Sequence, residues 1–221
     1  MDGLERRYGE RVALAGVSLR LERGQTLAVF GSNGAGKTTL LRVLATLLRP
    51  HAGEARVLGS ALPGEAWRVR GRIGYLGHDP LLYRDLSGRE NLRYHARLHD
   101  APQARVEELL AAVGMERRAN DRVRDLSRGM AQRLAAARAL LHDPAVLLLD
   151  EPRAHLDPAG AELLEPLIGR ASGRTRVLVT HAVEAGLQEA DLALGLRAGR
   201  PAFASAPAEV TPQQTKELYE T

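Results

Sequence analysis

A glycine-rich run from Gly31 to Thr38, GSNGAGKT, constrains this 221-residue chain more than any other feature. It lies between an apolar run, 26–30, that predicts a buried strand and a leucine-rich run, 37–48, that predicts a helix. Glycines allow backbone N–H groups to curl around phosphates, and the helix N-terminus adds its positive end. Lys37 can reach β- and γ-phosphates, Thr38 can ligate Mg²⁺ and Thr39 can reach an α-phosphate. The run therefore predicts a nucleotide phosphate site made of Gly31, Ser32, Asn33, Gly34, Ala35, Gly36, Lys37, Thr38 and Thr39.

The composition disfavours several classes of protein. Hydrophobic residues make up 44% of the chain and charged residues 26%, which is ordinary for a globular domain. No apolar run approaches the roughly 20 residues that a membrane-spanning helix needs, and the N-terminus, MDGLERRYGE, is too polar for a secretory signal. The absence of cysteine excludes disulfides and thiolate metal sites. The net charge is +4, but the basic residues form no run, so we expect no nucleic-acid partner.

A second candidate site follows the apolar run 145–149, which ends in Asp150 and Glu151. A strand that is apolar throughout belongs inside a parallel sheet, and its carboxyl end delivers side chains to the crevice where ligands bind. Asp150 is placed to hold Mg²⁺ through water, and Glu151 to act as general base for an attacking water. Such a pair is also a common helix cap, but a phosphate-binding loop in the same chain favours the catalytic interpretation.

The remaining patterns alternate strands and helices. We expect an antiparallel strand over 12–21 and further strands over 53–58, 72–76, 176–180, 192–196 and 201–204. Helices are expected over 87–98, which opens with a capping box, over 102–114, over 127–141 and after Asp157. This order predicts an α/β fold with a single domain, 1–221, and a helical subdomain at about 80–142.

The helix expected from residue 127 opens with Leu126-Ser-Arg-Gly-Met130. Ser127 fits an N-cap, and its hydroxyl with the free N–H groups also forms an anion site. At this point the chain resembles the nucleotide-binding subunit of ABC transporters, whose signature sequence is usually LSGGQ. Arg128 and Met130 depart from that sequence, whereas Ser127 and Gly129, which family members aim at the γ-phosphate, are present.

The resemblance covers nearly the whole chain. Tyr8, ahead of the first expected strand, matches the aromatic residue that stacks on adenine. Asp157 matches the acid of the D-loop, and His181 matches the switch histidine that contacts the γ-phosphate. The resemblance implies a P-loop NTPase core with a mostly parallel sheet, an N-terminal antiparallel β-subdomain and a helical subdomain.

The resemblance also implies partners and cofactors. In the family, two such domains face head to tail and clamp ATP between the phosphate loop of one and the signature helix of the other. We therefore expect ATP and Mg²⁺ as cofactors, a second copy of this chain as partner, and hydrolysis that depends on Glu151 and His181. A separate transmembrane permease is the further partner, which implies a peripheral location at the cytoplasmic face of the cell membrane.

One turn departs from the family. Residues 73–78, IGYLGH, fall on the Q-loop, where a glutamine normally ligates Mg²⁺ and senses the membrane subunit, but here the position holds His78. Because Mg²⁺ prefers oxygen ligands, three interpretations stay open. His78 bonds a metal-bound water, Asp79 supplies the oxygen instead, or the turn serves mainly as a coupling hinge.

The same turn bears on the branch of the family. Residues 75–78, followed by LSGRENL at 86–92, resemble the ATP-binding subunit of the haem exporter of cytochrome c biogenesis. We therefore expect first that the chain belongs to this haem-export branch. The signature followed by Gln132-Arg133 is also common in drug and antibiotic exporters, so a general small-molecule exporter is the alternative. A soluble ABC ATPase that acts on nucleic acid or ribosomes is disfavoured by the single domain and the short helical insert.

Overall fold

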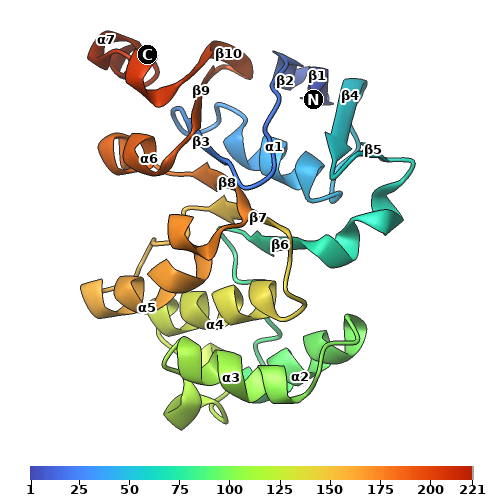
Figure 1. Cartoon of the computed structure of the whole chain (residues 1–221), viewed down its shortest axis with the longest axis vertical. Helices are drawn as coiled ribbons and strands as arrows, with labels where there is room; N and C mark the ends of the chain where they lie inside the picture. Colours follow the sequence, from blue (N-terminus) through green and yellow to red (C-terminus); the bar gives the residue numbers. More distant parts are fainter. Residues whose placement is uncertain (221) are drawn as a thin grey trace.

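The computed structural model describes residues 1–220, which form two sheets with helices around them (Figure 1). The smaller sheet is antiparallel and has the strand order β2-β1-β4-β5. Its strands are β1 (Asp2–Tyr8), β2 (Arg11–Val17), β4 (Ala52–Val57) and β5 (Ser60–Leu62). Strand β1 is unexpected, because its charged residues mask any apolar alternation. Tyr8 is therefore the last residue of the first strand and does not precede it.

The larger sheet has six strands in the order β10-β9-β3-β8-β7-β6, and only β10 runs antiparallel to its neighbour. Its strands are β3 (Thr26–Phe30), β6 (Ile73–Leu76), β7 (Val146–Asp150), β8 (Thr175–Val179), β9 (Leu192–Arg197) and β10 (Arg200–Ser205). Every residue of β3 and β7 is buried, as their apolar sequences predict. The carboxyl ends of β3 and β7 flank that of β8, so the phosphate loop and the acidic pair leave the same edge of the sheet.

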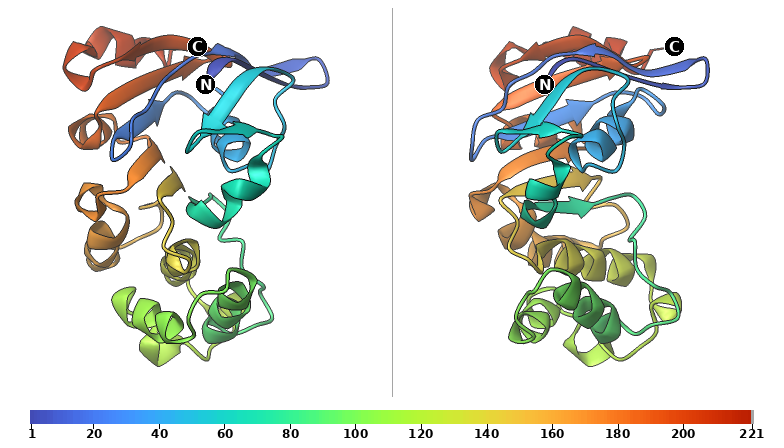
Figure 2. Two further views of the ribbon diagram at one scale, coloured as in Figure 1. Left: turned by 45° about the vertical axis from the view of Figure 1, so that its right-hand side comes forward. Right: turned by 90° about the vertical axis from the view of Figure 1, so that its right-hand side faces the viewer.

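Seven α-helices accompany the sheets in the part of the chain that the structure describes. They are α1 (Lys37–Leu44), α2 (Gly88–Leu98), α3 (Ala104–Ala112), α4 (Arg128–Leu140), α5 (Pro158–Ile168), α6 (Val183–Glu189) and α7 (Pro212–Glu217). Short 3₁₀ turns occupy 66–68, 70–72, 116–118, 123–125, 170–172 and 207–209. Helices α2, α3 and α4 gather at the end of the molecule opposite the antiparallel sheet, in all three ribbon views (Figures 1 and 2). Within residues 1–220, none of the helices has the length and apolar character that crossing a membrane requires.

Two boundaries differ from the sequence prediction by four residues each. Helix α1 ends at Leu44, not at residue 48, because Thr46 adopts a left-handed φ of 63° that breaks the helical hydrogen-bond pattern. Strand β2 ends at Val17, not at residue 21. The N–H of Leu19 donates instead to the carbonyl oxygen of Met1, at 3.0 Å, outside the sheet ladder. Apolar alternation therefore continues past Val17, the last residue of the strand.

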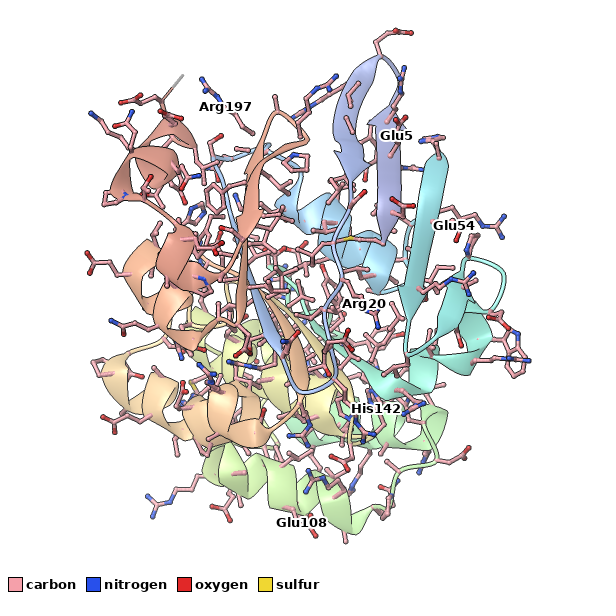
Figure 3. The ribbon with its side chains drawn as sticks, turned by 45° about the horizontal axis from the view of Figure 1, so that its top comes forward. Glu5, Arg20, Glu54, Glu108, His142 and Arg197 are labelled. Atoms are coloured by element: carbon pink, nitrogen blue, oxygen red, sulfur yellow. The ribbon has the colours of Figure 1, made fainter. Side chains whose placement is uncertain are left out.

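Charge is distributed over the whole surface. Figure 3 shows Glu5 and Glu54 on the antiparallel sheet, Glu108 on α3, and Arg20 and Arg197 elsewhere, with acidic and basic side chains interspersed. Most ion pairs join exposed side chains, and such pairs contribute little stability. The core is built from apolar side chains of both sheets and of the helical part.

Candidate functional site

The phosphate loop requires glycine at both ends. Gly31 and Gly36 have φ values of 147° and 107°, a region that other residues rarely adopt. A Cβ on Gly31 would lie 2.3 Å from the carbonyl oxygen of Leu196, and one on Gly36 would lie 2.2 Å from that of Ala13. Close backbone packing from two other strands thus fixes the loop. Between these ends, Ser32, Asn33, Gly34 and Ala35 form the turn, and Ala35 is buried.

Lys37 is folded over this loop. Its Nζ donates to the carbonyl oxygens of Gly31 and Ser32, at 2.7 and 3.0 Å, and the residue is only 7% exposed. Burial lowers the pKa of Lys37, and the negative charges of Glu151 and Asp150 partly oppose this effect. The ammonium group therefore lies within electrostatic reach of the acidic pair that follows β7.

Thr38 and Asp150 meet directly, although 112 residues separate them in sequence. The Thr38 hydroxyl donates to Asp150 Oδ2 at 2.8 Å, and Asp150 is 3% exposed. Burial raises the pKa of Asp150, the Thr38 hydrogen bond lowers it, and Glu151 raises it further. The charges of His78 and Lys37 lower it, which puts His78 in the electrostatic neighbourhood of this carboxylate. Thr39 lies in the first turn of α1 and is partly exposed.

Glu151 and His181 form a second pair at the same edge. His181 Nε2 lies 2.8 Å from Glu151 Oε1, and both side chains are partly exposed. The backbone N–H of Glu151 still donates to the carbonyl oxygen of Val179 at 2.9 Å, but its φ is 52°, in the left-handed region. This conformation turns the chain sharply after β7, and the Glu151 carboxylate meets His181, two residues after the end of β8. His181 contacts only Oε1 of Glu151, so the other carboxylate oxygen, Oε2, is available to accept a proton.

Comparison with known proteins agrees with this arrangement. The ABC transporter family model matches residues 14–154. A Nod factor export ATP-binding protein of Burkholderia orbicola is 37% identical over 212 residues, which cover 92% of this chain and 69% of that protein. The chain belongs to the ABC transporter family.

Other relatives of this ABC domain carry names that refer to different functions. A daunorubicin resistance ATP-binding protein of Streptomyces coeruleorubidus is 45% identical over 196 residues, 86% of this chain and 61% of that protein. A phosphonates import ATP-binding protein of Anaeromyxobacter dehalogenans is 37% identical over 235 residues, 99% of this chain and 47% of that protein. The chain therefore spans about half to two thirds of the length of these relatives.

The fold of the domain is that of an ABC ATPase. A dimeric post-hydrolysis state of an ATP-binding cassette with ADP and Pi matches it with a TM-score of 0.83 and 26% identity, over 93% of this chain and 97% of that one. The expected P-loop core, antiparallel subdomain and helical part are thus confirmed. None of the names reported above concerns haem.

The signature segment of the ABC domain contacts the D-loop of its own chain. Ser127 caps α4 by accepting the N–H of Met130 at 3.2 Å. A Cβ on Gly129 would lie 2.8 Å from the carbonyl oxygen of His155, so the start of α4 packs against the D-loop. Asp157 caps α5 by accepting the N–H of Gly160 at 2.9 Å. Within residues 1–220, no hydrogen bond or ion pair connects these residues with residues 31–39.

Tyr8 and His78 are both exposed. Tyr8 is 44% exposed, pairs with Arg11 across the β1–β2 hairpin, and has the Arg6 guanidinium 5.1 Å from its ring centroid. Arg11 in turn donates to the carbonyl oxygen of Gly34 at 3.4 Å, so the hairpin tip reaches the phosphate loop. His78 is exposed and lines a cavity of about 290 Å³ together with Asp79.

The sequence analysis assigned no role at the site to three residues that lie near it. Tyr219, near the C-terminus, has a pKa that burial raises and that a hydrogen bond with the Gly31 backbone lowers, so its phenol lies at the phosphate loop. Gln132 of α4 is 4% exposed and donates to the carbonyl oxygen of Pro152 at 3.4 Å. Arg153 forms ion pairs with two glutamates. Only Arg153 had a sequence signal, since an arginine beside an acidic pair suggests an ionic network.

Proposed function

We propose that this ABC domain, as a single unit of residues 1–221, binds ATP with Mg²⁺ at the phosphate loop and hydrolyses it. One observation carries the proposal. The loop, the Thr38–Asp150 pair and the Glu151–His181 pair all meet at the carboxyl ends of the adjacent strands β3, β8 and β7. In this reading Gly31–Thr39 hold the phosphates and Tyr8 stacks on the adenine.

The residues present fit a magnesium ion. Thr38 and Asp150 offer a hydroxyl and a carboxylate that already hydrogen-bond each other at 2.8 Å, and Mg²⁺ prefers such hard oxygen ligands. Within residues 1–220, no three His, Cys, Asp or Glu side chains are grouped so as to hold a metal by themselves. This agrees with a site that phosphate oxygens and water complete. When bound, the ion would neutralise charge on the phosphates.

The chemistry then follows from the chain's own groups. A water oxygen forms a bond to the γ-phosphorus while the bond from that phosphorus to the β–γ bridging oxygen breaks, which gives ADP and phosphate. Glu151 Oε2 accepts the proton of the attacking water. Lys37 exchanges its two loop carbonyls for phosphate oxygens. His181 Nε2 can donate to Glu151 or to the γ-phosphate but not to both, so ATP binding would move this ring from one acceptor to the other.

We infer that a second copy of the chain completes the site. The exposed cap of α4, with Ser127 and Gly129, and Asp157 of the D-loop would contact the γ-phosphate held by the partner. Two observations support this arrangement: within residues 1–220 these residues make no hydrogen bond or ion pair with residues 31–39, and the related cassette is dimeric.

The hydrolysis proposal is tested with Glu151→Gln. We expect the variant to bind ATP as tightly as the wild type, because the phosphate loop is unchanged, and to lose turnover by a factor on the order of 10² or more, because the base is missing. ATP turnover and nucleotide binding are measured on the same preparation. Wild-type turnover in Glu151→Gln would refute the role of Glu151 as the base.

We propose further that the domain drives a transmembrane permease as a peripheral subunit at the cytoplasmic face of the membrane, in export of a small molecule. The names of the daunorubicin resistance and Nod factor export relatives support export, whereas the phosphonates import relative shows that similar domains also occur in importers. The haem-export branch is a second candidate and depends on His78 within residues 75–78. The purified domain with its membrane subunit separates the two: stimulation of ATP turnover by haem but not by daunorubicin would favour the haem branch.

A further inference from the structure

The ring of Tyr8 has another side chain over one of its faces. Tyr8 is the last residue of β1 and is 44% exposed. The guanidinium of Arg6, two residues earlier on the same strand, lies over the ring, with its Cζ 5.1 Å from the ring centroid. The face of an aromatic ring attracts a cation at this distance. Among the described residues, Arg6 is the only cation placed over this ring, so the opposite face is not covered in the same way.

Arg6 is itself held in place by the backbone beside it. Its Nη1 donates to the carbonyl oxygen of Arg49 at 2.9 Å. The N–H of His51 donates to the carbonyl oxygen of Glu5 at 2.8 Å, directly next to Arg6. The segment that leads from α1 into β4 is thus tied to β1 on both the backbone and the side chain. A guanidinium anchored in this way keeps its position over the ring.

The charge of Arg6 has no acidic partner. Among residues 1–220, none of the ion pairs includes Arg6. Its Nε is buried and has no hydrogen-bond partner, so this atom is out of reach of water and of any ligand. A cation that has lost part of its hydration interacts more strongly with an aromatic face than a fully hydrated one. The interactions available to this charge are therefore the Tyr8 ring and the Arg49 carbonyl.

The hairpin that carries Tyr8 is also connected to the phosphate loop. Tyr8 pairs with Arg11 across the β1–β2 ladder, and Arg11 Nη2 donates to the carbonyl oxygen of Gly34 at 3.4 Å. This contact limits the separation between the ring and the loop that would hold the phosphates. Arg11 thus restrains where the ring lies, while Arg6 restrains how the ring is turned.

We propose that Arg6 is a positioning residue for the nucleotide base: it covers one face of Tyr8 and holds the ring so that the purine stacks on the other face. The proposal rests on the proposed function, in which Tyr8 stacks on the adenine. It adds that the stacking surface is formed before the nucleotide binds, and that the base approaches Tyr8 from the side opposite Arg6. Forming the surface in advance lowers the cost of ordering it on binding.

The expected size of the effect follows from the freedom of the ring. Without Arg6, the Tyr8 side chain can sample roughly three staggered χ1 positions. If they are equally populated and one of them presents the ring to the base, about one third of the molecules are competent to stack. The apparent affinity for the nucleotide is reduced by that fraction, so it should fall about threefold.

The test measures the Kd of ADP with Mg²⁺ on the full chain by isothermal titration calorimetry. ADP carries the base and lacks the γ-phosphate, so hydrolysis does not disturb the titration. We expect Arg6→Gln to raise the Kd about threefold. Arg6→Lys should recover most of the wild-type affinity, because an ammonium group is also attracted by the ring face. A general loosening of the fold would not show this recovery by charge.

Arg7→Gln is the matched control for charge and location. Arg7 is the next residue on β1, is exposed, and does not lie over the Tyr8 ring. Its replacement removes the same charge from the same strand, so ADP should bind this variant as it binds the wild type. Circular dichroism checks that every variant is folded, and Arg6→Ala replaces Arg6→Gln if the latter is not.

Tyr8→Leu separates the proposal from the function on which it rests. Wild-type ADP affinity in Tyr8→Leu would refute the stacking role of Tyr8 itself. If Tyr8→Leu weakens binding, Arg6→Gln should cause no further loss in the Tyr8→Leu chain, because Arg6 acts through the ring. With Tyr8→Leu weakened, three results would overturn the role of Arg6 alone. They are wild-type affinity in Arg6→Gln, tighter binding in Arg6→Gln, which would place the base on the Arg6 side, and an undiminished loss in the double variant.

Discussion

Replacing Glu189 by leucine should destabilise the domain more than replacing Arg176 by methionine, although the two residues form one ion pair. Glu189, the last residue of α6, joins two arginines. Its Oε2 lies 3.0 Å from Arg176 Nη1, and its Oε1 lies 2.6 Å from Arg153 Nη2. Arg176 is 1% exposed and lies on β8, whereas Arg153 lies on the surface two residues after Glu151.

The magnitude follows from what each change leaves behind. Without Glu189, the buried guanidinium of Arg176 keeps only the Thr26 hydroxyl and the Ile168 carbonyl as acceptors. Removing one partner of a buried pair costs about 3–5 kcal/mol. Without Arg176, Glu189 still pairs with Arg153 at the protein surface. The variant loses three hydrogen bonds of Arg176, and burial of the apolar methionine partly offsets that loss. The free energy of unfolding should therefore fall by roughly 1–3 kcal/mol. The double variant should lie near the Arg176→Met value, since no buried charge is left.

Urea unfolding of the wild type, both single variants and the double variant gives the four free energies. For a domain of this size, each kcal/mol lowers Tm by roughly 2–4 °C, so Glu189→Leu should lower it by about 6–20 °C. Arg170→Gln is the control, because its pair with Asp191 is largely exposed and should contribute at most about 1 kcal/mol. A larger loss for Arg176→Met than for Glu189→Leu, or strict additivity in the double variant, would refute the shared-carboxylate reasoning.

Three further predictions concern the site and the histidines. Gly129→Ala should lower ATP turnover by a factor on the order of ten or more without weakening ATP binding to the monomer, because its Cβ would lie 2.8 Å from the His155 carbonyl oxygen; unchanged turnover would contradict this packing. Ser127→Arg should abolish turnover while the monomer still binds ATP, and loss of both together would count against a shared site. His95 and His142 bind fewer protons folded than unfolded, so folding stability should fall as pH drops from about 6.5 toward 4, by about 1–2 kcal/mol for each ring at pH 5. Urea titrations at several pH values should show a weaker fall in the His95→Gln/His142→Gln variant, and equal slopes would contradict it.

The elements nearest the nucleotide could be predicted because their sequence determines them locally. Residues 26–38 combine an apolar strand, glycines that need φ values open only to glycine, and a helix start, so sequence order alone places the loop. Asp150 and Glu151 end a strand that is buried throughout, which fixes their position at the sheet edge. The capping boxes and N-caps at Ser87, Ser127 and Asp157 were also predictable, since each is a contact within three residues.

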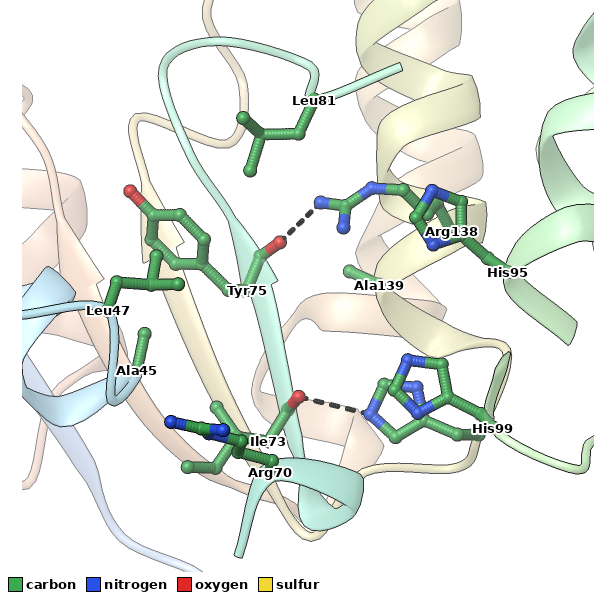
Figure 4. Close-up of a pocket in the computed structure, with 11 residues that line it drawn as sticks. Ala45, Leu47, Arg70, Ile73, Tyr75, Leu81, His95, His99, Arg138 and Ala139 are labelled. Atoms are coloured by element: carbon green, nitrogen blue, oxygen red, sulfur yellow. Dashed lines mark hydrogen bonds between the residues drawn. The ribbon is translucent and has the colours of Figure 1, made fainter. Parts of the chain in front are cut away.

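Features that depend on distant pairing could not be predicted in the same way. Strand β1 is too charged to show alternation and becomes a strand only because β2 and β4 offer backbone partners on both sides. The end of α1 is decided by the left-handed residue Thr46, which has no sequence signature. A pocket lined by His95, His99, Arg138 and His142 joins residues 95–99 with 138–142 across two helices and a strand (Figure 4), and no local pattern marks such a cluster.

His78 shows why the nucleotide site could be inferred more securely than the transported substrate. Burial raises the pKa of Asp150, and a positive charge on His78 would oppose that rise, so His78 lies within electrostatic reach of the candidate magnesium site. A residue this close to Asp150 affects how the nucleotide and its Mg²⁺ would be bound. Selection of the transported substrate requires contact with that substrate. If a separate permease carries the substrate, residues 73–80 would not contact it. The Leu-Gly-His sequence therefore bears on hydrolysis more directly than on cargo. Relatives whose names concern daunorubicin resistance, Nod factor export and phosphonates import all resemble this one domain.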